Sequence, residues 1–346
     1  MTDNFSGTIV TTRIRLARNI RGYNFRATLR DDLAEHIVVS VAKQIEKYCK
    51  TINCPSLTLY RMRDVQESVR GEFVERYVIS NDLMHNVKTG AVLMSDDESI
   101  SLMINEEDHV RAQSLQTGNN LTKAYKSLMP LDSWLDKTLG YAKSSRLGYL
   151  TACPSNVGTG LRASAMMFLP ALTRNGLISE VIDRADMLGL TVRGAFGEGS
   201  DSDSCLYQVS NEVTLGKSET QIIDEVQRFV TELARREKFL AQSYYNSNQV
   251  KLEDEVFRAY ALLTNCRILE YKEFSKLLSS VKFGAILNII EVNDITDLDY
   301  LLVNARDNTL TNSLAGSGEM VNDQNISIFR ASYVRECLTK MCKTSK

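Results

Sequence analysis

The sequence is poor in the residues that build disulfide frameworks and zinc sites. Its 346 residues include only three histidines, and its seven cysteines form an odd number with no Cys-x-x-Cys pair. A secreted disulfide scaffold needs paired cysteines, and a structural zinc site needs cysteines and histidines at short spacings. We therefore expect reduced thiols and no metal ion held by protein side chains alone.

Long apolar runs and a basic excess are also missing. No stretch approaches the roughly 20 apolar residues of a membrane helix, and the first residues lack the basic and apolar segments of a signal peptide. The 41 basic residues stand against 43 acidic ones, which gives a formal net charge of −2. A surface that follows nucleic-acid phosphates usually shows as a basic excess. These absences predict a cytoplasmic protein that binds neither membranes nor nucleic acids.

Hydrophobic periodicity predicts both helices and strands. Apolar residues recur every four positions over residues 33–45, after a capping-box pattern at residues 28–31, which predicts a helix with one buried face. Apolar and polar residues alternate over residues 100–104 and 205–215, and further strands are predicted at 146–151 and 190–193. Such alternation favours antiparallel pairing. We predict an α+β fold in which helices back an antiparallel sheet.

A polar segment, residues 241–250, marks a predicted domain boundary. Ser218 and Gln221 form a capping box that opens a helix before this segment, and beyond it the apolar spacing is helical. We predict a catalytic domain of residues 1–245 that contains the sheet, followed by a smaller all-α C-terminal domain of residues 250–346.

One chemical motif is the stretch 153–160, with sequence CPSNVGTG, followed closely by Arg162. A lone cysteine is usually a small buried hydrophobe. Here Pro154 fixes the turn, Ser155 can hydrogen-bond a thiolate, and the two glycines would let the backbone approach a ligand. A thiolate, a tight turn and a guanidinium so close together indicate a site that recognises a charged substrate.

A second motif, residues 105–109 with sequence NEEDH, follows the predicted strand 100–104 and precedes Arg111. Taken singly, an arginine is more often a solvated surface charge. In this order, however, the two motifs, the segment TTRIR at residues 11–15 and the segment RGAFGE at residues 193–198 resemble the ATP:guanido phosphotransferase family. Within that family the chain is most similar to the bacterial protein-arginine kinases of the McsB type, well over about residues 7–240 and more loosely beyond.

The resemblance implies ATP, with Mg²⁺, as the phosphoryl donor. Phosphoryl transfer requires little covalent work from a protein, because the charge on the phosphate oxygens must be neutralised and the nucleophile held in line. Arginine forks bind phosphate oxygens bidentately. By resemblance, the nucleotide is bound by Thr11, Thr12, Arg13, Ile14, Arg15, Arg111, Arg162, Ala163, Ser164, Ala165, Met166, Arg193, Gly194, Ala195, Phe196 and Gly197.

The acceptor implied by the resemblance is a guanidinium, which is a poor nucleophile until a proton is removed or its charge is balanced. A carboxylate does both. By resemblance, Glu107 is the catalytic base, Glu198 is a second carboxylate that grips the guanidinium, and Cys153 is a thiolate that orients the substrate without bonding to it covalently. The remaining acids and the histidine of the NEEDH motif are expected to end the strand and satisfy backbone groups.

Two positions depart from the family pattern. Family members often carry a histidine near the adenine ahead of an Ile-Ser pair, where this chain has Tyr77 before Ile79 and Ser80. Protein-arginine kinases typically carry Arg-Asp-x-x-Arg-Ala as a C-terminal phosphoarginine-binding motif. Residues 326–331 read ISIFRA here, so that Arg330 remains while the first arginine and the aspartate are missing. We expect phosphoarginine to bind the C-terminal domain weakly or not at all.

Three functions are open at this point. The resemblance favours transfer of the γ-phosphoryl of ATP to arginine side chains of proteins, which marks them for quality control, degradation or regulation. It implies protein substrates, a zinc-binding activator of the McsA type, the Clp protease machinery and a second copy of the chain in a homodimer as partners. The alternative is a small-molecule guanidino kinase, such as an arginine kinase. Those enzymes carry a helical domain ahead of the Arg-x-Arg segment, for which the residues before Arg13 leave no room.

The third function is that of a non-catalytic adaptor for arginine-bearing or phosphoarginine-bearing proteins. An adaptor needs to bind a guanidinium but has no use for a base or for a set of phosphate-binding arginines. The presence of Glu107, Glu198 and Cys153 together with all five arginines speaks against it.

Overall fold

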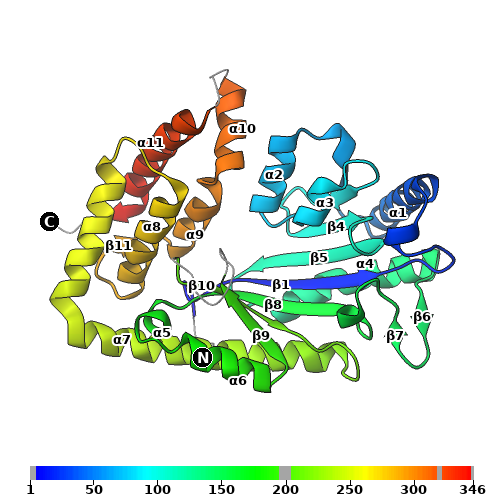
Figure 1. Ribbon diagram of the computed structural model, residues 1–346, viewed down its shortest axis with the longest axis horizontal. Helices are drawn as coiled ribbons and strands as arrows, with labels where there is room; N and C mark the ends of the chain where they lie inside the picture. The colour runs from blue at the N-terminus through cyan, green and yellow to red at the C-terminus, as the bar shows by residue number, and fades with distance from the viewer. Residues whose placement is uncertain (1–4, 195–203, 318–321, 344–346) are drawn as a thin grey trace.

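The computed structural model describes residues 5–194, 204–317 and 322–343. It contains one large sheet with helices behind it and a second, mostly helical part formed by the C-terminal residues (Figure 1). The strands are β1 (Ile9–Arg18), β2 (Thr58–Arg61), β3 (Ala91–Met94), β4 (Ile100–Ile104), β5 (Val110–Thr117), β6 (Lys143–Ser144), β7 (Gly148–Tyr149), β8 (Leu161–Phe168), β9 (Leu190–Gly194), β10 (Leu206–Asn211), β11 (Glu291–Val292) and β12 (Cys342–Lys343). The helices are α1 (Asp31–Ile52), α2 (Glu67–Glu75), α3 (Asn81–His85), α4 (Leu121–Leu139), α5 (Pro170–Arg174), α6 (Ile178–Met187), α7 (Glu219–Asn265), α8 (Tyr271–Ile286), α9 (Ile295–Asn304), α10 (Asp307–Ser317) and α11 (Asp323–Met341), with short 3-10 turns η1 (Arg26–Thr28), η2 (Met62–Asp64) and η3 (Pro154–Asn156).

The large sheet has eight strands in the order β2-β3-β4-β5-β1-β8-β10-β9, and every pairing in it is antiparallel. Along β1, fully buried Ile14 and Leu16 alternate with half-buried Arg13 and Arg15. The apolar face packs against α1, α4 and the first part of α7 (Figure 1). The predicted α+β fold, an antiparallel sheet backed by helices, is confirmed, and its other face carries the polar side chains.

The C-terminal part begins within α7. This helix of 47 residues kinks at Asn248, whose side chain donates a hydrogen bond to the carbonyl of Tyr244 at 3.1 Å. A polar side chain that bonds to the preceding turn bends a helix. The polar segment 241–250 is therefore part of a kinked helix. Most of its polar side chains lie on the exposed side of that helix.

A second hydrophobic core lies among α7, α8, α9 and α11. A short β11–β12 pair joins these helices, which the all-α prediction did not include. Because this core also takes in Phe168 and Leu206 from the sheet region, the two parts of the chain pack closely, and the division into residues 1–245 and 250–346 stays a prediction. None of the helices in the described ranges combines the length and apolarity that spanning a bilayer requires.

Local boundaries differ from the predictions where tertiary contacts decide them. The capping box at residues 28–31 does not form, since α1 begins at Asp31 and its N-cap, Arg30, makes no side-chain cap. The strand predicted over 205–215 is shortened to Leu206–Asn211. The capping box of Ser218 and Gln221 is confirmed at the start of α7.

Candidate active site

The strand register places the five arginines of the predicted nucleotide site on one face of the sheet. Residues directly opposite each other in an antiparallel pair point to the same side. Arg15 lies opposite Arg162, and Ala17 lies opposite Arg111. Arg13 shares this face because it is two residues from Arg15. The pairs Ser164–Ser210 and Gln208–Arg193 carry the same face across to β9.

Within the described part of the chain, three of these five arginines lack a matching anion, whereas Arg111 is paired with Glu106. Among the described residues, no ion pair involves Arg13, Arg15 or Arg162, and the Nε atom of Arg15 is buried without a hydrogen-bond partner. Burial and the charges of Arg111 and Arg162 lower the pKa of Arg13 to about 10. Burial and the neighbouring guanidinium groups lower the pKa of Arg15 well below its ordinary value. Buried cations that repel one another are costly unless an anion joins them, so the face suits a polyanion.

Other residues of the predicted nucleotide site turn away from this face. Thr12, Ile14, Ala163 and Ala165 alternate with the arginines along β1 and β8, and their side chains are buried in the core side of the sheet. Side chains of successive strand residues point to opposite faces. These four residues can therefore border a ligand only through their backbones.

The turn between β4 and β5 is held by most residues of the NEEDH motif. Asn105 takes a left-handed φ of 58°, which asparagine tolerates, and its amide donates to the carbonyl of Ala34 at 3.0 Å. Glu106 is buried, accepts a hydrogen bond from the Ser80 hydroxyl at 2.5 Å and is paired with Arg111. These contacts fix the turn against α1, α3 and β5.

His109 holds the same turn as a neutral ring. Burial lowers its pKa, and its two nitrogens have complementary partners. Nδ1 accepts a hydrogen bond from the N–H of Ile20 at 3.1 Å, and Nε2 lies 2.8 Å from the carbonyl of Asn24, to which a neutral ring donates. Its contacts are those of a structural residue.

Glu107 is the one residue of the motif whose side chain is exposed. Partial burial and the negative charges of Asp108 and Glu106 raise the pKa of Glu107 above its ordinary value, while Arg111 acts in the opposite direction. A carboxylate with a raised pKa accepts a proton more readily than an ordinary glutamate. Since its neighbours hold the turn, Glu107 is free to meet a substrate beside the arginines.

The carboxylate of Asp108 joins this turn to the cysteine loop. It is buried and accepts a hydrogen bond from the N–H of Ala152 at 2.7 Å. Cys153 is the next residue, and its Sγ lies 3.0 Å from the hydroxyl of Ser155. The contact between Asp108 and Ala152 brings Glu107 and Cys153 to the same end of the arginine face.

The two glycines of the cysteine loop pack against the protein itself. A Cβ at Gly158 would lie 2.4 Å from the carbonyl oxygen of Thr214, and one at Gly160 would lie 2.6 Å from that of Ala17. Both glycines also have positive φ values, 116° and 59°. These close contacts with β1 and with the segment after β10 account for both glycines, and the approach of this backbone to a ligand stays a prediction.

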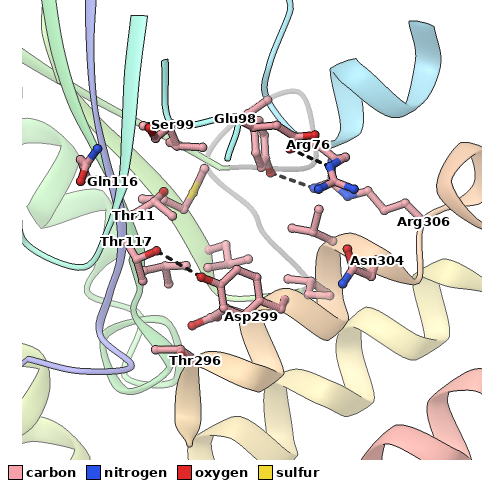
Figure 2. A pocket seen from close by; sticks show the side chains of 18 of the residues that line it. Thr11, Arg76, Glu98, Ser99, Gln116, Thr117, Thr296, Asp299, Asn304 and Arg306 are labelled. Atoms are coloured by element: carbon pink, nitrogen blue, oxygen red, sulfur yellow. Dashed lines mark hydrogen bonds and ion pairs between the residues drawn. The ribbon is translucent and has the colours of Figure 1, made fainter. Parts of the chain in front are cut away.

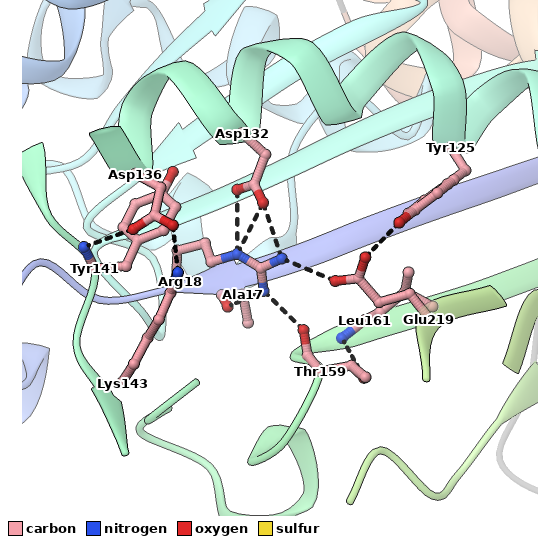
Figure 3. Close-up of polar contacts among 10 residues, drawn as sticks. All are labelled: Ala17, Arg18, Tyr125, Asp132, Asp136, Tyr141, Lys143, Thr159, Leu161 and Glu219. Atoms are coloured by element: carbon pink, nitrogen blue, oxygen red, sulfur yellow. Dashed lines mark hydrogen bonds and ion pairs between the residues drawn. The ribbon is translucent and has the colours of Figure 1, made fainter. Parts of the chain in front are cut away.

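A buried ion-pair network supports the cysteine loop from behind (Figure 3). Arg18 is fully buried, and its guanidinium donates to both carboxylate oxygens of Asp132 in α4, at 3.0 to 3.2 Å. It also donates to the carbonyl of Thr159 at 2.8 Å and lies 3.6 Å from the centre of the Tyr149 ring. Burial alone would lower the pKa of Arg18, but Asp132 raises it above its ordinary value. Sequence reasoning missed this residue because Asp132 is 114 positions away.

Some predicted site residues lie where nothing is described. Ala195, Phe196, Gly197 and Glu198 fall outside the described residues, and Arg193 and Gly194 end β9 just before them. The roles assigned to these residues stay predictions.

A cleft of about 380 Å³ opens at the other end of the arginine face (Figure 2). Tyr77 and Met166 line it on the sheet side, and Tyr300 and Arg306 line it on the side of the C-terminal helices. A smaller cavity continues from Tyr77 toward Arg13. The residues on the helical side of this cleft could not be found from the sequence, because no local pattern predicts that the C-terminal part folds back onto the sheet. Tyr77 could be found, because it precedes the Ile-Ser pair where family members often carry a histidine.

Arg330, the remaining residue of the C-terminal phosphoarginine motif, is buried. Its guanidinium donates to the carbonyls of Ala305 at 2.8 Å and Leu269 at 2.9 Å, and it is paired with Asp307. Ser327, at the position of the missing aspartate, donates to Glu270 at 2.8 Å. These contacts join α8, α10 and α11, and the weak or absent binding of phosphoarginine at Arg330 stays a prediction.

Comparison with known families identifies the fold. The family model of the ATP:guanido phosphotransferase C-terminal catalytic domain matches residues 40–240. The chain belongs to the ATP:guanido phosphotransferase family. The model of the protein-arginine kinase McsB C-terminal domain matches residues 249–346, on the other side of the kinked segment of α7. The resemblance inferred from the motifs is therefore confirmed.

Curated relatives in the family cover nearly the whole chain. It is 35% identical over 332 residues to the protein-arginine kinase of Caldanaerobacter subterraneus subsp. tengcongensis. The aligned residues cover 96% of this chain and 97% of the relative. It is 37% identical over 336 residues to the protein-arginine kinase of Bacillus subtilis, over 96% of this chain and 90% of the relative. Within the family, the chain falls in the protein-arginine kinase branch.

Solved structures of guanidino kinases share the fold. The duplicated taurocyamine kinase from Schistosoma mansoni with bound transition-state-analogue components matches with a TM-score of 0.61 at 26% identity, over 72% of this chain and 36% of the duplicated chain. Lombricine kinase matches with a TM-score of 0.60 at 24% identity, over 68% of each chain, which supports the fold alone.

Proposed function

We propose that this protein is an ATP-dependent protein-arginine kinase, which transfers the γ-phosphoryl of ATP to arginine side chains of proteins. The observation that carries the proposal is the arginine face, in which Arg13, Arg15 and Arg162 have no ion-pair partner among the described residues. This face ends beside Glu107, the one exposed residue of its turn. Fixed cations neutralise charge on the transferring phosphoryl group, and a base beside them takes the proton of the nucleophile. The names of the curated relatives support a protein-borne arginine as the acceptor.

The order of side chains along β1 gives the nucleotide a direction. Glu107 and Cys153 lie at the end where β1 reaches Arg18, and Arg13 and Arg15 lie in the middle. We place the acceptor guanidinium beside Glu107 and the triphosphate across the arginines. The unpaired Nε of Arg15 then gains an acceptor, and the mutual repulsion of the guanidinium groups is relieved.

The nucleoside would occupy the cleft at the far end. Its volume of about 380 Å³ lies within the usual range for small-molecule sites, and Tyr77 and Met166 give it aromatic and apolar walls for a base. Mg²⁺ would enter with the nucleotide, because this ion is usually bound through substrate phosphates, and it would share in neutralising their charge.

The acceptor guanidinium requires a base and a carboxylate grip. As the family resemblance implies, Glu107 would take a proton from the acceptor guanidinium as the phosphoryl group arrives. The carboxylate of Glu198 would balance the positive charge of the guanidinium. Cys153 would orient it through the thiolate, beside the hydroxyl of Ser155.

We expect Cys153→Ser to lower kcat by about tenfold, since it disturbs the orientation of the acceptor but leaves both carboxylates. Turnover is measured with a protein acceptor at saturating Mg-ATP. Cys266→Ser, a half-buried cysteine at the end of α7, is the matched control and should leave turnover unchanged. A phosphocysteine trapped at Cys153 during turnover would contradict the orienting role.

The choice of acceptor separates this proposal from a small-molecule guanidino kinase. We expect ADP release with an unfolded, arginine-containing protein and little with free arginine at the same concentration of guanidinium groups. Turnover on free arginine with no transfer to protein would favour the small-molecule kinase. ATP binding without transfer to either acceptor would favour the adaptor.

The wider cellular role rests on the family resemblance. We propose that phosphorylated proteins are marked for quality control, degradation or regulation, and that the partners are an activator of the McsA type, the Clp protease machinery and a second copy of the chain in a homodimer. ATP dependence agrees with a cytoplasmic location.

A further inference from the structure

The C-terminal part docks on the sheet domain at a polar interface between α2 and α10, which face each other in Figure 1. The carboxylate of Glu75, at the end of α2, accepts four hydrogen bonds of 2.9 Å from the backbone and side chains of Asn308 and Thr309. A carboxylate at a helix N-terminus satisfies its free N–H groups and suits its dipole. Asn312 adds a hydrogen bond to Glu72 at 2.6 Å. The start of α10 is therefore held firmly against the end of α2.

Arg306, which immediately precedes α10, reaches from this interface to the cleft. Its guanidinium donates to the backbone carbonyl of Glu75 at 2.8 Å and to the hydroxyl of Tyr77 at 2.8 Å. Its central carbon also lies 5.1 Å from the centre of the Tyr77 ring. Figure 2 shows Arg306 extending from the helical side toward Arg76 and Glu98 across the cleft.

Tyr77 is held in one orientation by these contacts. Its backbone has a φ of 62°, an uncommon conformation for a bulky residue, and its carbonyl accepts a hydrogen bond from the Gln113 side chain at 2.7 Å. Its ring lines both the cleft and the cavity that leads to Arg13. The orientation of this ring therefore shapes the path between the proposed nucleoside pocket and the first phosphate-binding arginine.

We infer that Arg306 is a positioning residue that holds the Tyr77 ring as a wall of the nucleoside pocket, so that this one side chain of the C-terminal part contributes to ATP affinity. This inference rests on the proposed function in so far as the ligand of the cleft is the nucleoside of ATP. A second contact crosses the cleft between the hydroxyls of Tyr300 and Thr117, at 3.4 Å, but it does not touch Tyr77.

The test compares two ligands on the full chain by isothermal titration calorimetry. Mg-ATP reaches both the arginines and the cleft, whereas Mg-tripolyphosphate reaches the arginines alone. The variants are Tyr77→Phe, which removes only the hydroxyl, and Arg306→Lys, which keeps the charge but loses the guanidinium fork. Each should raise the Kd for ATP by about fivefold, which corresponds to the net contribution of one ordinary hydrogen bond, here the one that sets the ring. The Kd for tripolyphosphate should stay unchanged.

A matched control separates positioning from general docking. Asn312→Ala weakens the same α2–α10 interface without touching Tyr77. It should leave the Kd for ATP unchanged. The double variant of Tyr77→Phe and Arg306→Lys should bind ATP no more weakly than either single one, because both remove the same contact. In turnover, the KM for ATP should rise while kcat stays constant.

Equal losses of ATP and tripolyphosphate affinity, an equal loss in Asn312→Ala, or additive losses in the double variant would each overturn the inference. Unchanged ATP affinity in both Tyr77→Phe and Arg306→Lys would overturn it as well. If the wild-type protein bound no ATP, the proposed function would fail and this inference would fail with it. If the inference alone were wrong, the wild type would still bind ATP, so the two failures can be distinguished.

Discussion

Replacement of Glu107 by glutamine should lower kcat by about a thousandfold while ATP affinity stays close to that of the wild type. The amide has nearly the same shape, but it can neither take the proton of the acceptor guanidinium nor balance its charge. The turn should survive, because the other residues of the motif hold it through Ala34, Ser80 and Ala152 while Glu107 is exposed.

Single-turnover transfer and calorimetric ATP binding together measure this effect. Asp82→Asn is the matched control, since it removes an exposed carboxylate near Glu107 that has no place in the proposed mechanism. In the wild type, kcat/KM should fall as pH drops through the raised pKa of Glu107, because the protonated acid is no longer a base. This acid limb should disappear in the glutamine variant. Near-normal turnover of Glu107→Gln would show that another group is the base.

Replacement of Arg15 by methionine should have opposite effects on function and stability. Transfer should fall by about a thousandfold or more, which is the lower end of what one arginine contributes in phosphoryl transfer. The free energy of unfolding should rise, because a half-buried arginine with a buried, unpaired Nε and repelling neighbours is replaced by an apolar side chain of similar length.

Chemical denaturation without nucleotide measures the stability change, and transfer at saturating ATP measures the functional one. Arg228→Met, on the exposed side of α7, is the control and should change the free energy of unfolding by less than about 0.5 kcal/mol. If the free energy of unfolding of Arg15→Met fell together with transfer, Arg15 would be stabilising the sheet, and the repulsion that we assign to the arginine face would be absent.

The sequence predicted an antiparallel sheet and the strands that lead into two of the motifs, because those segments alternate between apolar and polar residues. Residues 100–104 and 190–193 are strands, and the chemical motifs follow directly at their ends. The same alternation puts Arg13 and Arg15 on one face. Local patterns failed where distant contacts decide: the capping box at 28–31 does not form, and the strand predicted over 205–215 ends at Asn211.

The unpredicted parts of the candidate site depend on long-range packing. Arg18 looks like one more arginine shortly after the TTRIR segment, and only the folded chain brings Asp132 to it. Arg306 meets Tyr77 across 229 positions, with no local pattern to mark the encounter. Asn105, by contrast, could have been found as a turn residue, since asparagine tolerates the left-handed backbone of a tight turn.

The most direct test of the central claim is mass spectrometry of an unfolded, arginine-containing protein after incubation with this chain and Mg-ATP. Sample handling must avoid acid, because phosphate on a guanidinium is acid-labile. We expect phosphate on arginine side chains with the wild type and none with Glu107→Gln. Phosphate on free arginine but never on protein arginine, or on hydroxyl side chains instead, would contradict the account.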